Sequence, residues 1–167
     1  MRLVVLAAAI GLAATRASAQ ISQPPDEDHA IIFEIGAAAE GEPGEGSAHP
    51  GATFAFEVTP IEHWLEIEAG VSAIHDESGT EIPVDLLFKK PWRFSRTVEF
   101  MAGVGPEIIH ATGHDAATYW GLSAVADFMI WPARNVGWYV EPGYEATFRG
   151  GVTHHGWAFA GGLLLGR

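Results

Sequence analysis

The sequence predicts an all-β protein, an eight-stranded antiparallel up-and-down transmembrane β-barrel. Eight segments alternate apolar and polar residues with period two, which indicates strands with two different faces. In each segment the large apolar side chains share one face, whereas carboxylates, Gly, Ala and Ser share the other. Turn-forming residues separate the segments, and alternating segments of about ten residues with such turns are typical of barrels that cross a membrane.

Four strands are expected in the first half of the chain, at residues 29–39, 51–59, 63–74 and 79–89. Four more are expected at residues 97–110, 118–131, 137–148 and 155–166. Gly and Ala on the polar face suit the narrow interior of an eight-stranded barrel, which side chains just fill. The alternating large residues, strand by strand, include Phe33 and Ile35, Phe54 and Phe56, Ile67 and Val71, Val84 and Leu86, Phe100 and Val104, Leu122 and Phe128, Val140 and Tyr144, and Phe159 and Leu163.

The first residues have the pattern of a secretory signal peptide. Arg2 supplies a positive charge, residues 3–14 form a short apolar run, and Ala17-Ser18-Ala19 fits a cleavage site. The run is shorter than the roughly 20 apolar residues that a membrane-spanning helix needs. The expected organisation is a signal peptide at 1–19, an N-terminal periplasmic segment at 20–28 and a β-barrel domain at 29–167.

The composition narrows the function classes. The formal net charge is −12, which argues against nucleic-acid binding, because that function requires a basic surface. The chain has no cysteine, although an exported protein of this size is free to form disulfides. A closed, hydrogen-bonded barrel in lipid offers a different source of stability.

The connections between strands also alternate in character. Short links are expected at 60–62, 90–96 and 132–136, and longer Gly-, Ser-, Thr- and His-containing loops at the other end. Barrels of the outer membrane have short periplasmic turns and longer external loops. Aromatic residues gather near both sets of strand ends, as in the aromatic girdles of membrane barrels. They are Trp64, Trp92, Phe94, Trp131 and Trp138 at the short-turn end, and Tyr119, Trp120, Phe148 and Trp157 at the loop end.

Taken together, these features resemble the OmpA/OmpX-type small outer-membrane β-barrel family. The likeness covers the chain after the signal peptide and is one of pattern, without a short diagnostic motif. It implies an outer-membrane location, with outer-membrane lipid and the barrel assembly machinery as partners and a structural or surface-interaction role. Family members usually finish on an aromatic residue, whereas this chain ends Leu165-Gly166-Arg167. A soluble periplasmic lipocalin-like binder is the rival structural interpretation.

An acidic barrel interior is the first candidate site. By the alternation, Lys89 is the one strand cation expected to point inward among many carboxylates. Like charges in a confined space cannot all ionise without counter-charges. Two interpretations follow: a cation conduit or store, since rings of carboxylates favour cations, or a polar plug that is hydrogen-bonded shut. The plug is favoured, and the carboxylates concerned are Glu34, Glu68, Asp85, Asp127, Glu141 and Glu145.

Histidines form the second candidate site. Six of the eight fall at the loop end, with acidic residues beside several of them. Imidazole with carboxylate suits divalent transition metals such as Zn²⁺ or Ni²⁺. The predicted ligands of a rim metal are His110, His114, His154 and His155, and the alternative is that they are solvated loop residues. No other cofactor is expected.

The third candidate is enzymatic. Some small barrels of the family modify lipid A, and the deacylase type has an H-x-S-N sequence on a late strand. The seventh predicted strand reads VEPGYEATF and lacks that pair, and Ser123 has no histidine near it in sequence. A catalytic triad requires a nucleophile, a base and an orienting acid within reach. No enzyme activity is therefore expected. The expected function is structural or surface-interacting, and the alternative is a narrow cation-conducting barrel.

Overall fold

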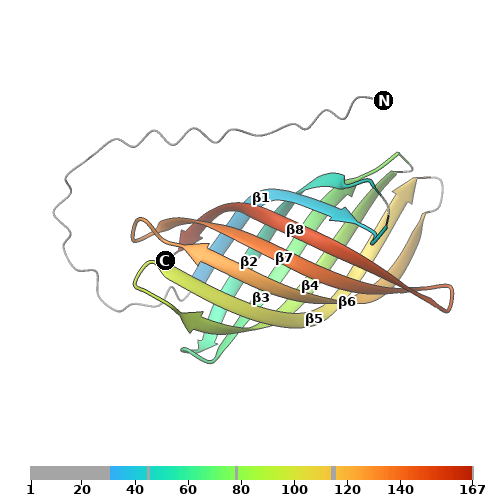
Figure 1. Ribbon diagram of the computed structural model, residues 1–167. Coiled ribbons are helices and arrows are strands. Elements are labelled where there is room, and N and C mark those ends of the chain that lie inside the picture. The colour runs from blue at the N-terminus through green and yellow to red at the C-terminus, as the bar shows by residue number, and fades with distance from the viewer. Residues whose placement is uncertain (1–30, 45, 78, 114–115, 167) are drawn as a thin grey trace.

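The alternating segments form eight antiparallel strands that close into a barrel, because β8 pairs with β1 as well as with β7 (Figure 1). The computed structural model describes residues 31–44, 46–77, 79–113 and 116–166. This architecture confirms the predicted eight-stranded antiparallel barrel. In the described part of the chain, no helix is long and apolar enough to cross a membrane. The strands are β1 (Ile31–Gly41), β2 (His49–Ile61), β3 (Leu65–His75), β4 (Gly79–Arg93), β5 (Val98–Gly113), β6 (Ala117–Ile130), β7 (Val136–Arg149) and β8 (Val152–Gly166).

The two ends of the barrel are named here by their connections. At the turn end lie the β2–β3, β4–β5 and β6–β7 connections, together with the start of β1 and the end of β8. At the loop end lie the other four connections. The predicted signal peptide and N-terminal segment fall outside the described residues.

Several strands run further than the alternation predicts. β4 continues to Arg93, β5 to Gly113, and β8 already begins at Val152. The β7–β8 connection is reduced to Gly150 and Gly151, whose φ angles of 60° and 81° suit a two-residue hairpin. The expectation of a long loop at this connection is therefore wrong. Backbone pairing continues wherever a neighbouring strand is present, whether or not the side chains still alternate.

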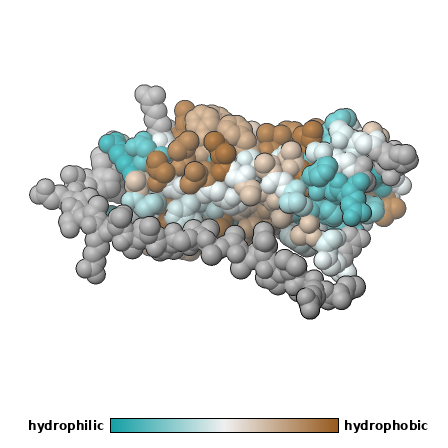
Figure 2. Space-filling model, turned by 90° about the horizontal axis from the view of Figure 1, so that it is seen from above, coloured by the Kyte–Doolittle hydropathy of each residue, from teal (hydrophilic) through white to brown (hydrophobic). Residues whose placement is uncertain are grey.

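The outer surface of the barrel is apolar around its middle. Leu122 is 49% exposed there, and Phe33, Val104 and Leu163 are exposed in the same way on other strands. On the face that Figure 2 displays, hydrophobic residues occupy the central part of the wall, and hydrophilic residues lie toward both ends. This apolar belt is the opposite of what a water-facing barrel wall requires.

Aromatic residues border the belt at both ends. At the turn end, Trp92 and Phe94 are exposed and pack beside Phe100, with ring centroids 5.6 and 6.0 Å away. At the loop end, Trp120 is exposed and stacks on Phe148 at 4.3 Å. Trp131 differs from the girdle prediction: it is 8% exposed and points into the barrel, because it follows Asp127 and Met129 on the inward side of the alternation.

The turn end of the interior is filled by large apolar side chains, which form an apolar plug. The wall approaches this plug closely: a Cβ on Gly36 would lie 2.8 Å from Tyr139 Oη and 2.4 Å from the Gly161 carbonyl oxygen. The apolar plug therefore depends on a glycine at position 36 of β1, because any side chain there would collide with Tyr139 and the β8 backbone. Its members are Ile32, Met101, Met129, Trp131, Tyr139 and Leu164.

Candidate functional site

A layer of charged side chains lies next to the apolar plug. Side chains on one face of a strand recur every two residues, so each plug residue has an inward neighbour one step closer to the loop end. On three strands that neighbour is a carboxylate. The pairs are Ile32 and Glu34 on β1, Met129 and Asp127 on β6, and Tyr139 and Glu141 on β7.

Lys89 is at the centre of this layer. Its ammonium group is fully buried and donates hydrogen bonds to Glu68 Oε2 at 2.5 Å and Glu141 Oε2 at 2.7 Å. A third hydrogen bond reaches Asp127 Oδ2 at 3.2 Å, and Glu57 Oε2 lies 3.8 Å away. We call these five residues the lysine hub. It ties β4 to β2, β3, β6 and β7 across the interior.

The hub leaves some of its acceptors without a donor. An ammonium group has three N–H donors, and Lys89 directs them at Glu68, Glu141 and Asp127. Neither carboxylate oxygen of Glu57 has a hydrogen-bond partner among the described residues. The same holds for one oxygen of Glu34 and for Asp127 Oδ1. One lysine is therefore not enough for the carboxylates around it.

The local sequence makes room for the lysine side chain. Lys89 on β4 pairs with Gly103 on β5, and a Cβ on Gly103 would lie 2.6 Å from Lys89 Cγ. A larger residue at this position would push the lysine stem away from the wall. The small inward residue at position 103 thus leaves the space that the Lys89 side chain occupies.

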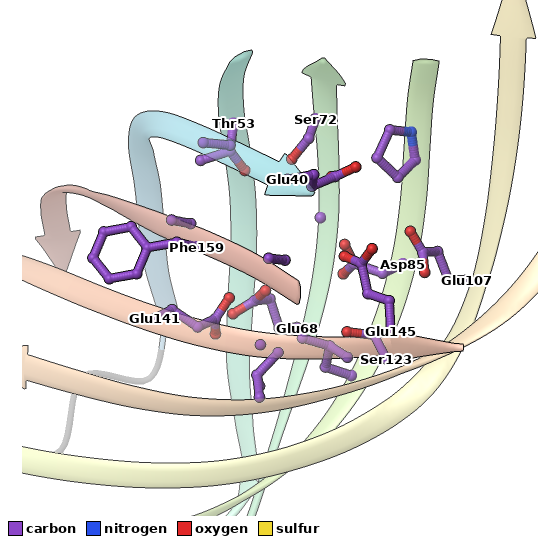
Figure 3. Close-up of a pocket in the computed structure, with 18 of the residues that line it drawn as sticks. Glu40, Thr53, Glu68, Ser72, Asp85, Glu107, Ser123, Glu141, Glu145 and Phe159 are labelled. Atoms are coloured by element: carbon purple, nitrogen blue, oxygen red, sulfur yellow. The ribbon is translucent and has the colours of Figure 1, made fainter. Parts of the chain in front are cut away.

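A small polar cavity extends from the hub toward the loop end. The space in it that water can occupy is about 50 Å³. Figure 3 shows the carboxyl groups of Glu68 and Glu141 close together on one side of the cavity, and those of Asp85, Glu107 and Glu145 gathered on the other side. The interior is therefore apolar at the turn end, charged in the middle and acidic toward the loop end.

The predicted interior carboxylates fall into two groups. Four of them surround Lys89 or lie beside it in the charged layer, namely Glu34, Glu68, Asp127 and Glu141. The other two, Asp85 and Glu145, line the cavity. Sequence reasoning did not select Glu57 as a site residue, although its inward position on β2 was readable. It also missed the apolar plug, whose signal was the series of large inward residues near the strand ends.

Of the histidines predicted to bind a metal, His110, His154 and His155 do not come together with other potential ligands among the described residues. His110 and Thr118 share a hydrogen bond of 2.9 Å on the outer side of the wall, and His155 stacks on Tyr144 at 5.8 Å. His154 lies 4.0 Å from Glu42 Oε1, and His114 lies outside the described residues. A rim metal site that includes His114 stays a prediction.

One group of potential metal ligands does come together among the described residues. One ligand atom from each of Glu34, Glu57 and Asp127 lies within 4.8 Å of the others. All three side chains are buried. We call this group the carboxylate triad.

Comparison with known proteins finds likeness in structure only. No family model matches the chain, and no curated protein matches it in sequence. Neisserial surface protein A is similar in structure, with a TM-score of 0.64 and 9% identity over 82% of this chain and 96% of that chain. The N-terminal β-barrel domain of Pseudomonas aeruginosa OprF has a TM-score of 0.58 and 7% identity over 83% of this chain and 100% of that chain. Likeness at such low identity shows the fold alone: a small, closed, eight-stranded antiparallel β-barrel.

Proposed function

We propose that this protein is a bacterial outer-membrane β-barrel, closed through its interior, with a structural or surface-interaction role. The apolar belt is the observation that carries the proposal. Large apolar side chains are exposed on all eight strands. Exposed apolar patches of this extent are rare on soluble monomers, and lipid is the environment that covers a belt running round the whole wall.

The aromatic residues that border the apolar belt also support a location in the outer membrane. Exposed Trp and Phe side chains at both ends fit the lipid–water interfaces, where amphipathic rings are enriched. At the turn end, Lys90 lies 5.7 Å from the Trp92 ring centre. A long basic side chain at this level can place its charge among lipid headgroups. Outer-membrane lipid and the barrel assembly machinery are the partners that this location implies.

The interior supports a closed barrel over a cation conduit. The apolar plug fills the turn end, and the lysine hub crosses the middle of the barrel with three hydrogen bonds. Ion conduction requires a continuous polar path. The role is therefore assigned to the outer surface of the barrel, not to transport through it.

A surface-interaction role would use the loop end. The name of the similar neisserial barrel describes it as a surface protein. On this chain the longest described connection at that end runs from 42 to 48, beside extended strand ends that carry exposed polar residues. They include Glu42, His75, Glu77, His110, Thr112, Arg149 and His154.

Membrane fractionation tests the location. We expect the protein in the outer-membrane fraction, and we expect the unheated, detergent-extracted protein to migrate faster on a gel than the boiled protein. A folded, hydrogen-bonded barrel resists detergent until it is heated, which accounts for the shift. Recovery of the folded protein in the soluble periplasmic fraction would contradict the proposal and favour the lipocalin-like alternative.

Planar-bilayer recording tests the closed interior. We expect no steady conductance from the purified, folded protein, because the plug and the hub lie in series along the barrel axis. A preparation with verified heat-modifiability controls for misfolded material. Steady cation-selective channels would refute the closed barrel and support the conduit alternative, whatever the fractionation result.

A further inference from the structure

The carboxylate triad has more acceptor capacity than the protein satisfies. Glu57 and Asp127 are 0% exposed and Glu34 is 2% exposed. Four of their oxygens have no hydrogen-bond partner among the described residues: Glu34 Oε1, both oxygens of Glu57 and Asp127 Oδ1. Buried acceptors left in this state cost free energy, so an unsatisfied cluster calls for an explanation.

The charge balance points to a positively charged partner. Lys89 is surrounded by Glu57, Glu68, Asp127 and Glu141 within 4.0 Å, and its three donors are already engaged. Asp127 shows the division most clearly: Oδ2 accepts from Lys89, while Oδ1 is left for another partner. One lysine thus faces more carboxylates than it can neutralise, and Glu34, Glu57 and Asp127 keep oxygens that accept no hydrogen bond from it.

We propose that the triad of Glu34, Glu57 and Asp127 binds a divalent cation of the hard, oxygen-preferring class, with Ca²⁺ the best fit. Carboxylate oxygens are the ligands that such ions take. The three ligand oxygens lie within 4.8 Å of one another, so a small movement of the side chains brings them to a common ion. Ca²⁺ tolerates such irregular geometry at about 2.4 Å, whereas Mg²⁺ demands a near-ideal octahedron at about 2.1 Å. Neither oxygen of Glu57 accepts a hydrogen bond from Lys89 or another N–H donor, and its carboxyl group lies against that of Glu66. A cation bound there would separate these two carboxyl groups and could take Glu57 in a bidentate manner.

The residues around the triad determine how the cation reaches it and how tightly the cation is expected to bind. The apolar plug lies on the turn-end side of the layer, so the ion is expected to arrive through the acidic cavity, which Glu34 also lines. The Lys89 ammonium, 3.8 Å from Glu57 Oε2, opposes a second positive charge. We therefore expect affinity in the weak range of Ca²⁺ sites, with a dissociation constant of about 0.1–1 mM.

Calorimetric titration of Ca²⁺ into the folded, full-length protein in detergent tests the site. We expect saturable binding of one Ca²⁺ per chain and a thermal unfolding midpoint that rises with Ca²⁺ concentration. Glu57→Gln is the main variant, because it removes a charge without breaking a hydrogen bond to Lys89. It is expected to weaken binding by about tenfold or more, as loss of a metal-site residue usually does.

Glu145→Gln is the matched control. It removes one interior carboxylate from the cavity wall, outside both the triad and the hub, and should leave Ca²⁺ affinity unchanged. A gel-shift assay verifies that each variant is folded, and Glu34→Gln replaces Glu57→Gln if the latter does not fold. Absence of saturable binding up to about 10 mM Ca²⁺, well above the weak range, would overturn the proposal. Equal weakening by the triad and control variants would overturn it too, because it would indicate a diffuse acidic surface.

Discussion

Replacing Lys89 with Met is expected to destabilise the folded barrel by about 3–5 kcal/mol, the usual cost of removing one partner from a buried ion pair. Lys89 donates to Glu68, Glu141 and Asp127 in the buried interior of the barrel. Methionine has a similar length but no charge, so packing is largely kept while the carboxylates lose their only cation among the described ion pairs of the hub.

The measurement is equilibrium unfolding in guanidinium chloride, followed by tryptophan fluorescence, of parent and variant in the same detergent. Lys90→Met is the matched control, because the neighbouring side chain points outward and contacts Trp92 and the His63 carbonyl oxygen. That change should cost no more than about 1 kcal/mol, the scale of an exposed cation–π contact. An equal loss for both variants would mean that Lys89 contributes no more than a surface lysine.

A rescue variant separates charge from packing. Adding Glu68→Gln and Glu141→Gln to Lys89→Met removes two of the charges that the lysine compensates. Because residues in one network couple, the triple variant should recover much of the stability that the single change loses. If the losses simply add, the cost lies in packing and the hub is not an electrostatic unit.

The face of each residue could be predicted from the sequence, because alternation along a strand is a local property. Leu122 and Ser123 are neighbours in the chain, yet the structure exposes the first and buries the second, as the pattern predicts. The ends of the strands could not be predicted equally well. Pairing of β4 with β5 continues through Pro91 and Trp92, since an adjacent strand still offers backbone partners beyond the alternating segment.

The candidate site could be predicted only in part, because alternation is local to one strand and contacts between strands are not. Alternation places Lys89 inside the barrel, but contacts between β4 and β7 cross the interior and depend on how the closed barrel staggers its strands. Trp131 shows a second limit of the prediction. Its place near a strand end suggested a girdle residue, whereas its position on the inward side of the alternation, two residues after Met129, directs the ring into the plug.

The second large effect is expected at Leu122, where substitution by Arg should destabilise the barrel by about 2–4 kcal/mol in lipid vesicles. Leu122 is exposed in the middle of β6, opposite Pro106 on β5 and Ala146 on β7. If lipid covers this position, an arginine places its charge in hydrocarbon, and the penalty is greatest near the bilayer midplane.

Ser123→Arg is the matched control, one residue along the same strand. Ser123 is 8% exposed and lines the acidic cavity, where Gly105 lies opposite and Glu107 and Glu145 offer counter-charges. A cation that pairs with a buried carboxylate recovers part of its desolvation cost, so we expect a smaller loss there than at Leu122. Unfolding of both variants is measured by denaturant titration in vesicles of one lipid composition. A loss at Ser123 as large as that at Leu122 would mean that the inner and outer faces of the wall do not differ in their tolerance of a charge, and the lipid-facing belt would lose its support.

A larger loss at Leu122 that disappears in detergent micelles would place the penalty in the bilayer itself, because a micelle adapts to a buried charge more readily than hydrocarbon of fixed thickness does.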